Sequence, residues 1–271
     1  MDEIENAKDL RIDLRRAQDM IAMMKREHAE EIAEARGNKF VRPARTKPMT
    51  LAYWDIRGLA QPIRLLLEYV GEPYEDKRYV QGPGPGFDKS CWTQVKDSIL
   101  GPEYPFPNLP YLQDGDTVVT QSNAIVRYIA REHHLLGNTK EQCRRVDVML
   151  EEAMDFRNRT VTMAYGRLGL GYAKEIHNYT QTLHQNLTKY SKFLGAWDWF
   201  AGESISCVDF VMFELLDQNS LMVKGCLSEY TNLEAFVARV AGLSAIAKFI
   251  QKTEALPCNN KHSYTSINGI C

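Results

Sequence analysis

FPNLPYLQDGDTVVTQSNAI, residues 106–125, predicts a strand, a tight turn, a second strand and a helix start. Leu109-Pro110 opens the first strand, because proline removes a ladder donor and belongs at a strand start or edge, where its peptide bond can be cis. Asp114-Gly115-Asp116 supplies the turn, and Ser122 is a good N-cap for the helix. Free N–H groups and the positive helix end would then lie beside Pro110, where a carboxylate could bind. This stretch alone supports a binding corner and an ordinary capped helix equally.

The sequence before this stretch predicts a βαβ unit. Residues 50–54 form an apolar strand, Gln61-Pro62 begins a helix that Gly71 ends, and residues 74–80 form a second strand. Residues 81–104 form a long loop-rich excursion, and loops of this length are usually functional. The resulting order β-α-β-loop-β-β-α is that of the thioredoxin-like fold.

Beyond a short link at residues 133–138, the sequence predicts helices up to about residue 253. Apolar residues recur at helical spacing over residues 146–165 and 183–194. Ser206 and Asp209 resemble a capping box, and the apolar run that follows them predicts the buried central helix of a bundle. The expected fold class is therefore an α/β thioredoxin-like domain followed by an all-α helical bundle domain.

The N-terminal part has a different character. Residues 2–36 contain no glycine or proline, and a narrow heptad stripe through Leu10, Leu14 and Ile21 predicts one long helix. It is either a coiled-coil or docking helix for a protein partner, or a solvated helix with incidental periodicity. The expected divisions of the chain are a helical extension (1–36), a basic linker (37–48), a thioredoxin-like domain (49–132), an all-helical domain (139–255) and a C-terminal surface tail (256–271).

Composition and charge exclude several classes of function. The length of 271 residues suits two domains and an additional piece, and the net charge of -2 gives no overall basic field for nucleic acid or membrane. The sequence has neither an apolar signal core nor a stretch of membrane-spanning length, so a cytoplasmic protein is expected. Its six cysteines are scattered and lack metal-ligand spacing, which predicts free thiols and no metal site.

The first strand-to-helix junction, residues 52–58, lacks the cysteine that thiol redox chemistry needs. It could instead hold the thiol of a ligand, with Tyr53 as the hydroxyl donor. Lowering a thiol pKa of about 8.5 by about two units requires roughly 2.7 kcal/mol. One hydrogen bond to a charged acceptor supplies about 1.5–3 kcal/mol, so one tyrosine could provide most of it. Residue type alone favours the alternative that Tyr53 and Trp54 are strand aromatics in the core.

Four segments resemble the signature segments of mu-class cytosolic glutathione transferases, in the family's order and at nearly its spacing. They are YWDIRGLA (53–60), FPNLPY (106–111), TQSNAI (120–125) and WFAG (199–202). The similarity covers about residues 49–256. It implies a homodimeric enzyme that joins its co-substrate glutathione to small hydrophobic electrophiles without a metal, with each active site between the two domains.

The resemblance also implies roles for individual residues. Tyr53 would stabilise the glutathione thiolate, Tyr165 would assist the electrophile, and Phe106 would insert into the partner subunit. The other glutathione-binding residues would be Trp54, Lys89, Trp92, Lys96, Asn108, Leu109, Gln121, Ser122 and, reaching across the dimer, Asp155. The electrophile pocket would contain Leu59, Met154, Asn158, Val161 and Tyr165.

The chain departs from the family pattern at several points. Lys89 stands where the family usually has arginine, which keeps the charge but loses the planar fork for a carboxylate. About three extra residues lie between Trp92 and Phe106, and Asn158 places an amide in a generally apolar pocket. Residues 2–36 lie outside the pattern altogether. They keep open a second hypothesis, a structural or adaptor protein that uses the transferase fold as a dimeric module anchored through its N-terminal helix.

Overall fold

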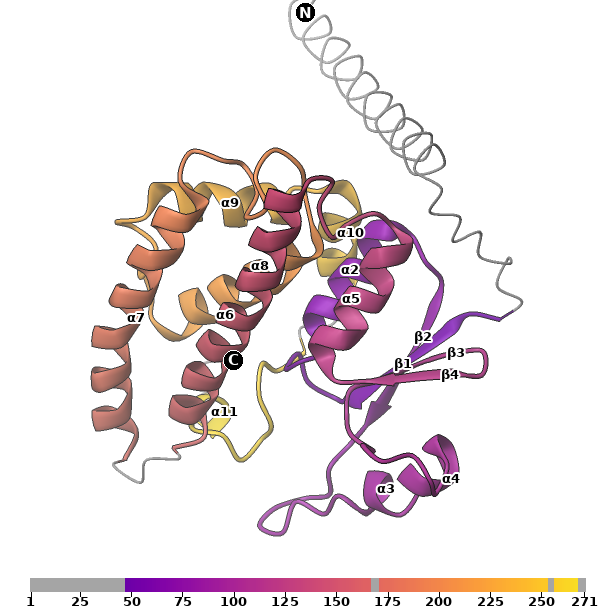
Figure 1. Cartoon of the computed structure of the whole chain (residues 1–271). Helices are drawn as coiled ribbons and strands as arrows, with labels where there is room; N and C mark the ends of the chain where they lie inside the picture. Colours follow the sequence, from indigo (N-terminus) through magenta and orange to yellow (C-terminus); the bar gives the residue numbers. More distant parts are fainter. Residues whose placement is uncertain (1–46, 167–170, 253–255, 268–271) are drawn as a thin grey trace, which may run out of the picture. The chain divides into compact units, whose positions relative to one another are not determined.

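The computed structural model of this chain describes residues 47–166, 171–252 and 256–267. The helix predicted over residues 2–36, with its coiled-coil stripe, lies outside the described residues, as does nearly all of the predicted linker. From residue 47 onward the described chain belongs to one compact unit. Within this unit, a small sheet with its helices is followed by a larger helical part (Figure 1).

The first part contains a four-stranded mixed sheet with the strand order β2-β1-β3-β4. β1 pairs in parallel with β2 and antiparallel with β3, and β3 pairs antiparallel with β4. The elements of this part are β1 (Met49–Trp54), α2 (Gln61–Val70), β2 (Tyr74–Tyr79), α3 (Ser90–Thr93), α4 (Lys96–Leu100), β3 (Tyr111–Asp114), β4 (Thr117–Thr120) and α5 (Ser122–Glu132). Their order and pairing confirm the predicted thioredoxin-like fold, and two short helices occupy the excursion that was expected to be a loop.

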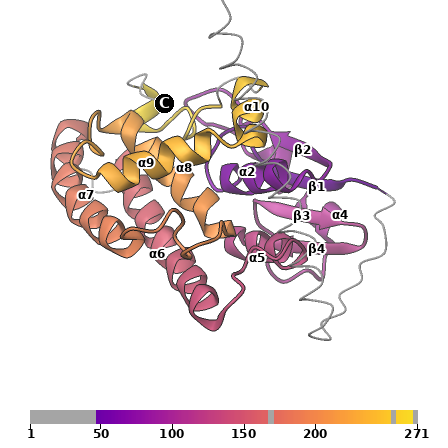
Figure 2. The same ribbon diagram turned by 90° about the horizontal axis from the view of Figure 1, so that it is seen from above.

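Helices α2 and α5 lie side by side on one face of the sheet, between the sheet and the helical part (Figure 2). The apolar side of α2 is buried there, including Ile63, Leu66 and Leu67. β3 begins directly after Pro110, whose preceding peptide bond is cis, and Gly115 forms the hairpin turn with a φ of 58°.

The second part is built around α8. Its elements are α6 (Lys140–Ala164), α7 (Tyr172–Leu194), α8 (Cys207–Met222), α9 (Thr231–Ala241), α10 (Ser244–Lys252) and α11 (Tyr264–Ile267). α8 packs against α2, α5, α6 and α9, and both apolar and polar residues along it are buried. Ser206 and Asp209 form the predicted capping box at its start. The prediction of a buried central helix is confirmed.

Two local predictions differ from the structure. The N-cap of α5 is Gln121, and Ser122 is the first helical residue. The φ of 72° at Gln121 turns the chain from β4 into the helix. The segment after α10 is not a surface tail, because Cys258, Asn259 and Thr265 are buried. Its backbone carbonyls at Pro257 and Cys258 accept hydrogen bonds from the loop after β1, which holds it against the body of the protein.

The prediction that all cysteines are free thiols is wrong for Cys258, which is disulfide-bonded. The other described cysteines, Cys91, Cys143, Cys207 and Cys226, are free. Within the described ranges, no helix combines the length and apolar character that a membrane span needs. No group of three or more His, Cys, Asp or Glu side chains among those residues is arranged to hold a metal ion.

Candidate active site

Tyr53 lies near the end of β1, with its ring covered by the loop that follows. Gly58 in this loop has a φ of 43°, and a Cβ there would lie 2.7 Å from Tyr53 Cε1 and 2.9 Å from its hydroxyl oxygen. Only glycine allows the backbone to approach the ring so closely in that conformation. The backbone N–H of Leu59 donates a hydrogen bond to the Tyr53 hydroxyl. The loop therefore fixes the position of this hydroxyl.

The ionisation of Tyr53 is set by burial and by a nearby cation. Only 5% of the residue is exposed, and burial raises the pKa of its hydroxyl above the ordinary value of 10.0, with the charge of Arg157 as the largest opposing influence. The hydroxyl consequently keeps its proton at neutral pH. A protonated phenol held at a fixed position can donate a hydrogen bond to an anion beside it.

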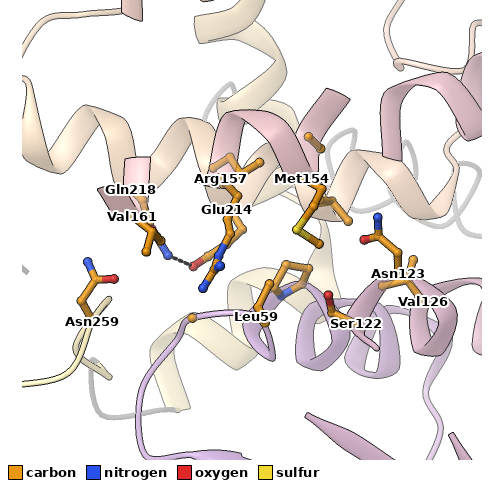
Figure 3. A pocket seen from close by; sticks show the side chains of 15 residues that line it. Leu59, Ser122, Asn123, Val126, Met154, Arg157, Val161, Glu214, Gln218 and Asn259 are labelled. Atoms are coloured by element: carbon orange, nitrogen blue, oxygen red, sulfur yellow. Dashed lines mark hydrogen bonds between the residues drawn. The ribbon is translucent and has the colours of Figure 1, made fainter. Parts of the chain in front are cut away.

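A hollow that is partly open to solvent lies beside this loop, between the first part and the helical part (Figure 3). One wall comes from the loop after β1 and the starts of α2 and α5, and the opposite wall comes from α6 and α8. Its lining comprises Gly58, Leu59, Pro62, Ser122, Asn123, Val126, Ala153, Met154, Arg157, Val161, Val211, Glu214, Leu215, Gln218 and Asn259. Of the predicted site residues, the structure thus brings together Leu59, Ser122, Met154 and Val161.

Asn158 does not line this hollow, whereas Arg157 does. Successive residues of an α-helix are turned by about 100°, so the side of α6 that carries Met154 and Val161 presents residue 157 to the hollow. Asn158 points elsewhere and lines a second, more polar hollow between α6 and α7, together with Asp155. Arg157 was not among the predicted site residues, although it follows Met154 by three positions and precedes Val161 by four, a spacing that places the three on one side of a helix.

The tryptophans predicted for the glutathione site lie at the end of β1 and in the short helix α3. Trp92 is 7% exposed and packs between Tyr79 and Tyr111, with ring centroids 5.4 and 5.8 Å away. Trp54 meets Tyr79 edge-on at 6.4 Å. Both tryptophans are therefore part of an aromatic cluster that ties the loop excursion to the sheet.

The polar residues predicted for the same site lie nearer the surface. Lys89 is exposed at the start of α3, and Lys96 forms an ion pair of 2.9 Å with Asp97. The side chain of Asn108 accepts a hydrogen bond of 2.8 Å from the backbone N–H of Leu109. Gln121 is exposed, and Ser122 is buried at the first turn of α5. Of these residues, only Ser122 lines the hollow.

Tyr165 ends α6 and contacts the segment after α10. Its hydroxyl oxygen accepts hydrogen bonds from the backbone N–H of Asn260 at 2.9 Å and from the Asn260 side-chain amide at 3.0 Å. Its ring lies 5.1 Å from that of His262. Because neighbouring Asn259 lines the hollow, this segment closes one end of it. The same segment accepts hydrogen bonds from Arg57 and Gly58, so it joins both walls.

A largely buried ion pair joins the two parts at the wall of the hollow. Arg57 donates to both oxygens of Glu214, at 3.0 and 2.6 Å, and to Asp217 at 2.5 Å. Gln218 donates to Glu214 at 2.6 Å. Burial raises the pKa of the Glu214 carboxyl, and Arg57 opposes this change. The pair anchors the loop that carries Gly58. No pattern in the sequence marks it, because its partners are far apart in the chain.

Taken together, these features form an apolar hollow with a protonated tyrosine hydroxyl and a helix start at its edge. A ligand that carries both a thiol and a carboxylate suits this arrangement, since the hydroxyl can donate to a thiolate and the first turn of α5 can bind a carboxylate. The rest of the hollow accepts an apolar molecule next to the thiol.

Comparison with known proteins connects this geometry to a family. Residues 49–131 match the glutathione S-transferase N-terminal domain, and residues 154–253 match the glutathione S-transferase C-terminal domain. The chain is 45% identical to glutathione S-transferase Mu 5 of Mus musculus over 80% of its own length and 95% of the mouse protein. It is 43% identical to glutathione S-transferase Mu 3 of Homo sapiens over 82% of its length and 97% of the human protein.

Solved structures show the same fold. The pi-class glutathione S-transferase of Onchocerca volvulus superposes with a TM-score of 0.70 at 28% sequence identity, over 80% of this chain and all of that protein. The glutathione S-transferase Blo t 8 superposes with a TM-score of 0.72 at 25% identity, over 79% of this chain and 98% of that protein.

Proposed function

Because this chain belongs to the mu-class glutathione S-transferases, we propose that Tyr53 stabilises the thiolate of bound glutathione and that the hollow beside it receives the electrophile. The observation that carries this proposal is the contact at Gly58. This residue lines the hollow and also packs against the Tyr53 hydroxyl, so that hydroxyl lies at the edge of the hollow. A sulfur bound to Tyr53 would therefore face an apolar substrate.

Glutathione would lie along the edge of the sheet, with its two carboxylates apart. The start of α5 at Gln121 and Ser122 would bind the γ-glutamyl carboxylate through N–H groups and the helix dipole. The glycyl end would meet Trp54, Lys89, Trp92 and Lys96, and the peptide backbone would bind at Asn108 and Leu109. Exposed Lys89 supplies charge without a planar fork, so we expect this end to bind less tightly than an arginine would allow.

The reaction is nucleophilic attack by sulfur. Tyr53 donates a hydrogen bond to the thiolate and lowers the cost of forming it, and the thiol proton leaves to solvent. The sulfur electron pair forms the new S–C bond, while either a leaving group departs or a π bond shifts its electrons to an acceptor atom. Tyr165, whose oxygen already accepts two hydrogen bonds from Asn260, would act as a donor to the electrophile.

The assembly that we propose is a cytoplasmic homodimer. Phe106 is 68% exposed, which is unusual for a phenylalanine, and insertion into a partner subunit would bury it. Asp155 is exposed on α6, away from the hollow of its own chain, so its proposed contact with glutathione would be made in the other subunit. Both features favour a dimer that completes each site.

The function is tested by turnover of the purified chain with glutathione and 1-chloro-2,4-dinitrobenzene, comparing wild type with Tyr53→Phe. In the variant, the pKa of the bound glutathione thiol should be about two units higher. The fraction of thiolate at pH 6.5, and with it turnover, should then fall by roughly 50- to 100-fold. Ultraviolet titration of bound glutathione should show the same rise in the thiol pKa. Tyr74→Phe is the matched control, because it removes a tyrosine hydroxyl that hydrogen-bonds to Glu68, outside the site.

Two results would contradict the proposal. If the wild-type protein binds glutathione but shows no turnover, it is a glutathione-binding protein and not an enzyme. A Tyr53→Phe variant with an unchanged thiol pKa would show that another group activates the sulfur.

A further inference from the structure

We propose that His262 is a positioning residue for the reaction: as a neutral ring between Phe87 and Tyr165, it joins the half of the site that holds glutathione to the half that assists the electrophile. This inference rests on the function proposed above, because it concerns how the two halves of that site are held together.

The segment that carries His262, residues 256–267, extends from one wall of the site to the other. Its carbonyls at Pro257 and Cys258 accept hydrogen bonds from the loop after β1, and it ends as α11 against α6 (Figure 1). Between these ends, Asn259 lines the hollow and Asn260 donates to the Tyr165 hydroxyl. The surroundings of Tyr165 therefore depend on where this segment lies.

The end of α6 is packed tightly against the same segment. A Cβ at Gly166, the residue after Tyr165, would lie 2.3 Å from the ring of Tyr264. The Tyr165 hydroxyl in turn accepts two hydrogen bonds from Asn260. A displacement of the segment would therefore also displace the Tyr165 hydroxyl.

Through His262 this segment meets the excursion of residues 81–104. The centroid of its ring lies 5.0 Å from that of Phe87 and 5.1 Å from that of Tyr165. Phe87 precedes Lys89 by two positions and Trp92 by five, and both of these are proposed to bind the glycyl end of glutathione. The imidazole is thus in contact with both halves of the site.

The surroundings of His262 favour its neutral form. Burial lowers the pKa of the imidazole below its ordinary value of 6.5, and the positive charge of Lys89 lowers it further. The Nδ1 atom is buried, and among the described residues it has no hydrogen-bond partner. Both nitrogens of a protonated imidazole are donors, so a proton at Nδ1 would leave a buried donor without an acceptor.

The neighbouring charged groups do not offset this cost. On the excursion, Asp88 already accepts hydrogen bonds from the backbone N–H and the hydroxyl of Ser90. On the segment itself, adjacent Lys261 is exposed and adds a second positive charge. On α6, Tyr165 faces the imidazole with its ring. Protonation of His262 should therefore expel the imidazole from its place between the two aromatic rings.

The first measurement tests the ring contacts. It is kcat/KM for styrene oxide at saturating glutathione and pH 7.5. In this reaction the thiolate forms an S–C bond, the C–O bond breaks, and the oxygen, which takes up a proton, is the atom that a donor at Tyr165 would assist. His262→Ala removes both ring contacts and should lower kcat/KM about tenfold, whereas His262→Phe keeps an aromatic ring and should stay within about twofold of wild type.

A double-mutant cycle shows whether His262 acts through Tyr165. If it does, the loss caused by His262→Ala should disappear in the Tyr165→Phe background, which lacks the hydroxyl that the segment positions. A general loosening of the protein would give the same loss in both backgrounds. Saturating glutathione keeps weaker binding at the excursion out of this comparison.

The second measurement tests the proton. The ratio of kcat/KM for wild type to that for His262→Phe is followed from pH 7.5 to pH 4.5, because titration of the glutathione thiol is common to both proteins and cancels. The ratio should be constant above pH 6.5 and fall below it, since only wild type can bind a proton at residue 262. His177→Phe is the matched control, because it removes an exposed imidazole on α7 that contacts Gln181, and its ratio to wild type should not change with pH.

The outcomes separate this inference from the function on which it rests. A loss in His262→Ala that disappears without the Tyr165 hydroxyl, together with a ratio that falls below pH 6.5, supports it. No loss in His262→Ala, a loss that persists in Tyr165→Phe, or a ratio that stays constant overturns it, while wild-type turnover leaves the function proposed for Tyr53 intact. If circular dichroism shows that His262→Ala is unfolded, the pH dependence of the ratio for His262→Phe decides alone.

The wild-type protein alone gives two further outcomes. Turnover of 1-chloro-2,4-dinitrobenzene without turnover of styrene oxide overturns this inference only. A wild-type protein that conjugates neither electrophile overturns the proposed function and this inference together.

Discussion

Asp209 should make the free energy of unfolding depend on pH in an unusual direction. Its side chain is fully buried at the start of α8. One carboxylate oxygen accepts the Phe200 N–H at 2.8 Å, and the other accepts the Ser206 N–H at 2.7 Å and the Ser206 hydroxyl at 2.9 Å. Burial raises the pKa of Asp209 from 3.8 to about 6, whereas these hydrogen bonds lower it. The effect of burial on the pKa is therefore the larger of the two.

The magnitude follows from the difference in pKa between the folded and unfolded states. A difference of about two units corresponds to about 3 kcal/mol. Between pH 4 and pH 6 the folded protein binds this proton more readily than the unfolded chain does. The contribution of Asp209 to the free energy of unfolding is therefore greatest below about pH 4 and is lost as the pH rises through about 6.

Asp209→Asn removes this titration and also one of the acceptor oxygens. The variant should be less stable than wild type, by an amount that shrinks by up to about 3 kcal/mol between pH 4 and pH 7. Urea denaturation followed by circular dichroism at several pH values, at one fixed protein concentration, measures the difference directly. Asp198→Asn, an exposed aspartate that pairs with Arg239, corrects for general charge effects.

The opposite trend would refute this reasoning. If the penalty of Asp209→Asn increases from pH 4 to pH 7, the three hydrogen bonds outweigh burial and the carboxyl has a lowered pKa in the folded protein. A penalty that is constant over this range would show that Asp209 has the same pKa in both states.

Three further substitutions test the geometry of the site and of the assembly. Gly58→Ala places a Cβ 2.7 Å from the Tyr53 ring, at a backbone φ of 43° that alanine adopts with strain. Turnover should therefore fall at least tenfold. Full turnover in this variant would show that the loop is not constrained. Glu214→Gln leaves partly buried Arg57 with Asp217, the more exposed of its two anionic partners, and should lower the unfolding free energy by about 3 kcal/mol in urea denaturation. Phe106→Ala should shift sedimentation at low micromolar concentration toward monomer, and an unchanged dimer would remove Phe106 from the interface.

The parts of the fold that local patterns govern could be predicted from the sequence. Leu109-Pro110 and Gly115 mark the start and the turn of the hairpin because only certain residues suit those backbone conformations. The capping box at Ser206 and Asp209 marked the start of α8 because both partners lie within one helical turn. These signals need no information about distant residues.

The parts that were missed depend on contacts between distant segments. The segment around Asn260 has no strong periodicity, and its burial arises from hydrogen bonds to Tyr165 and to the loop after β1. Arg157 and Asn158 are adjacent polar residues on one helix, and only the packing of α6 against α8 decides which of them faces the hollow. Gln121 was missed as N-cap because its left-handed backbone is uncommon for a residue with a side chain.

The ion pair that joins the two parts has a consequence for how the protein is made. Arg57 and Glu214 are 157 positions apart, and ribosomes add residues at about 5–20 per second, so roughly 8–30 s separate the synthesis of the two partners. During that time the nascent sheet with α2 and α5 lacks the helix that covers it, and the apolar side of α2 that packs on α8 remains uncovered. We expect chaperones that bind apolar surface to associate with the nascent chain during this interval and to dissociate once α8 emerges.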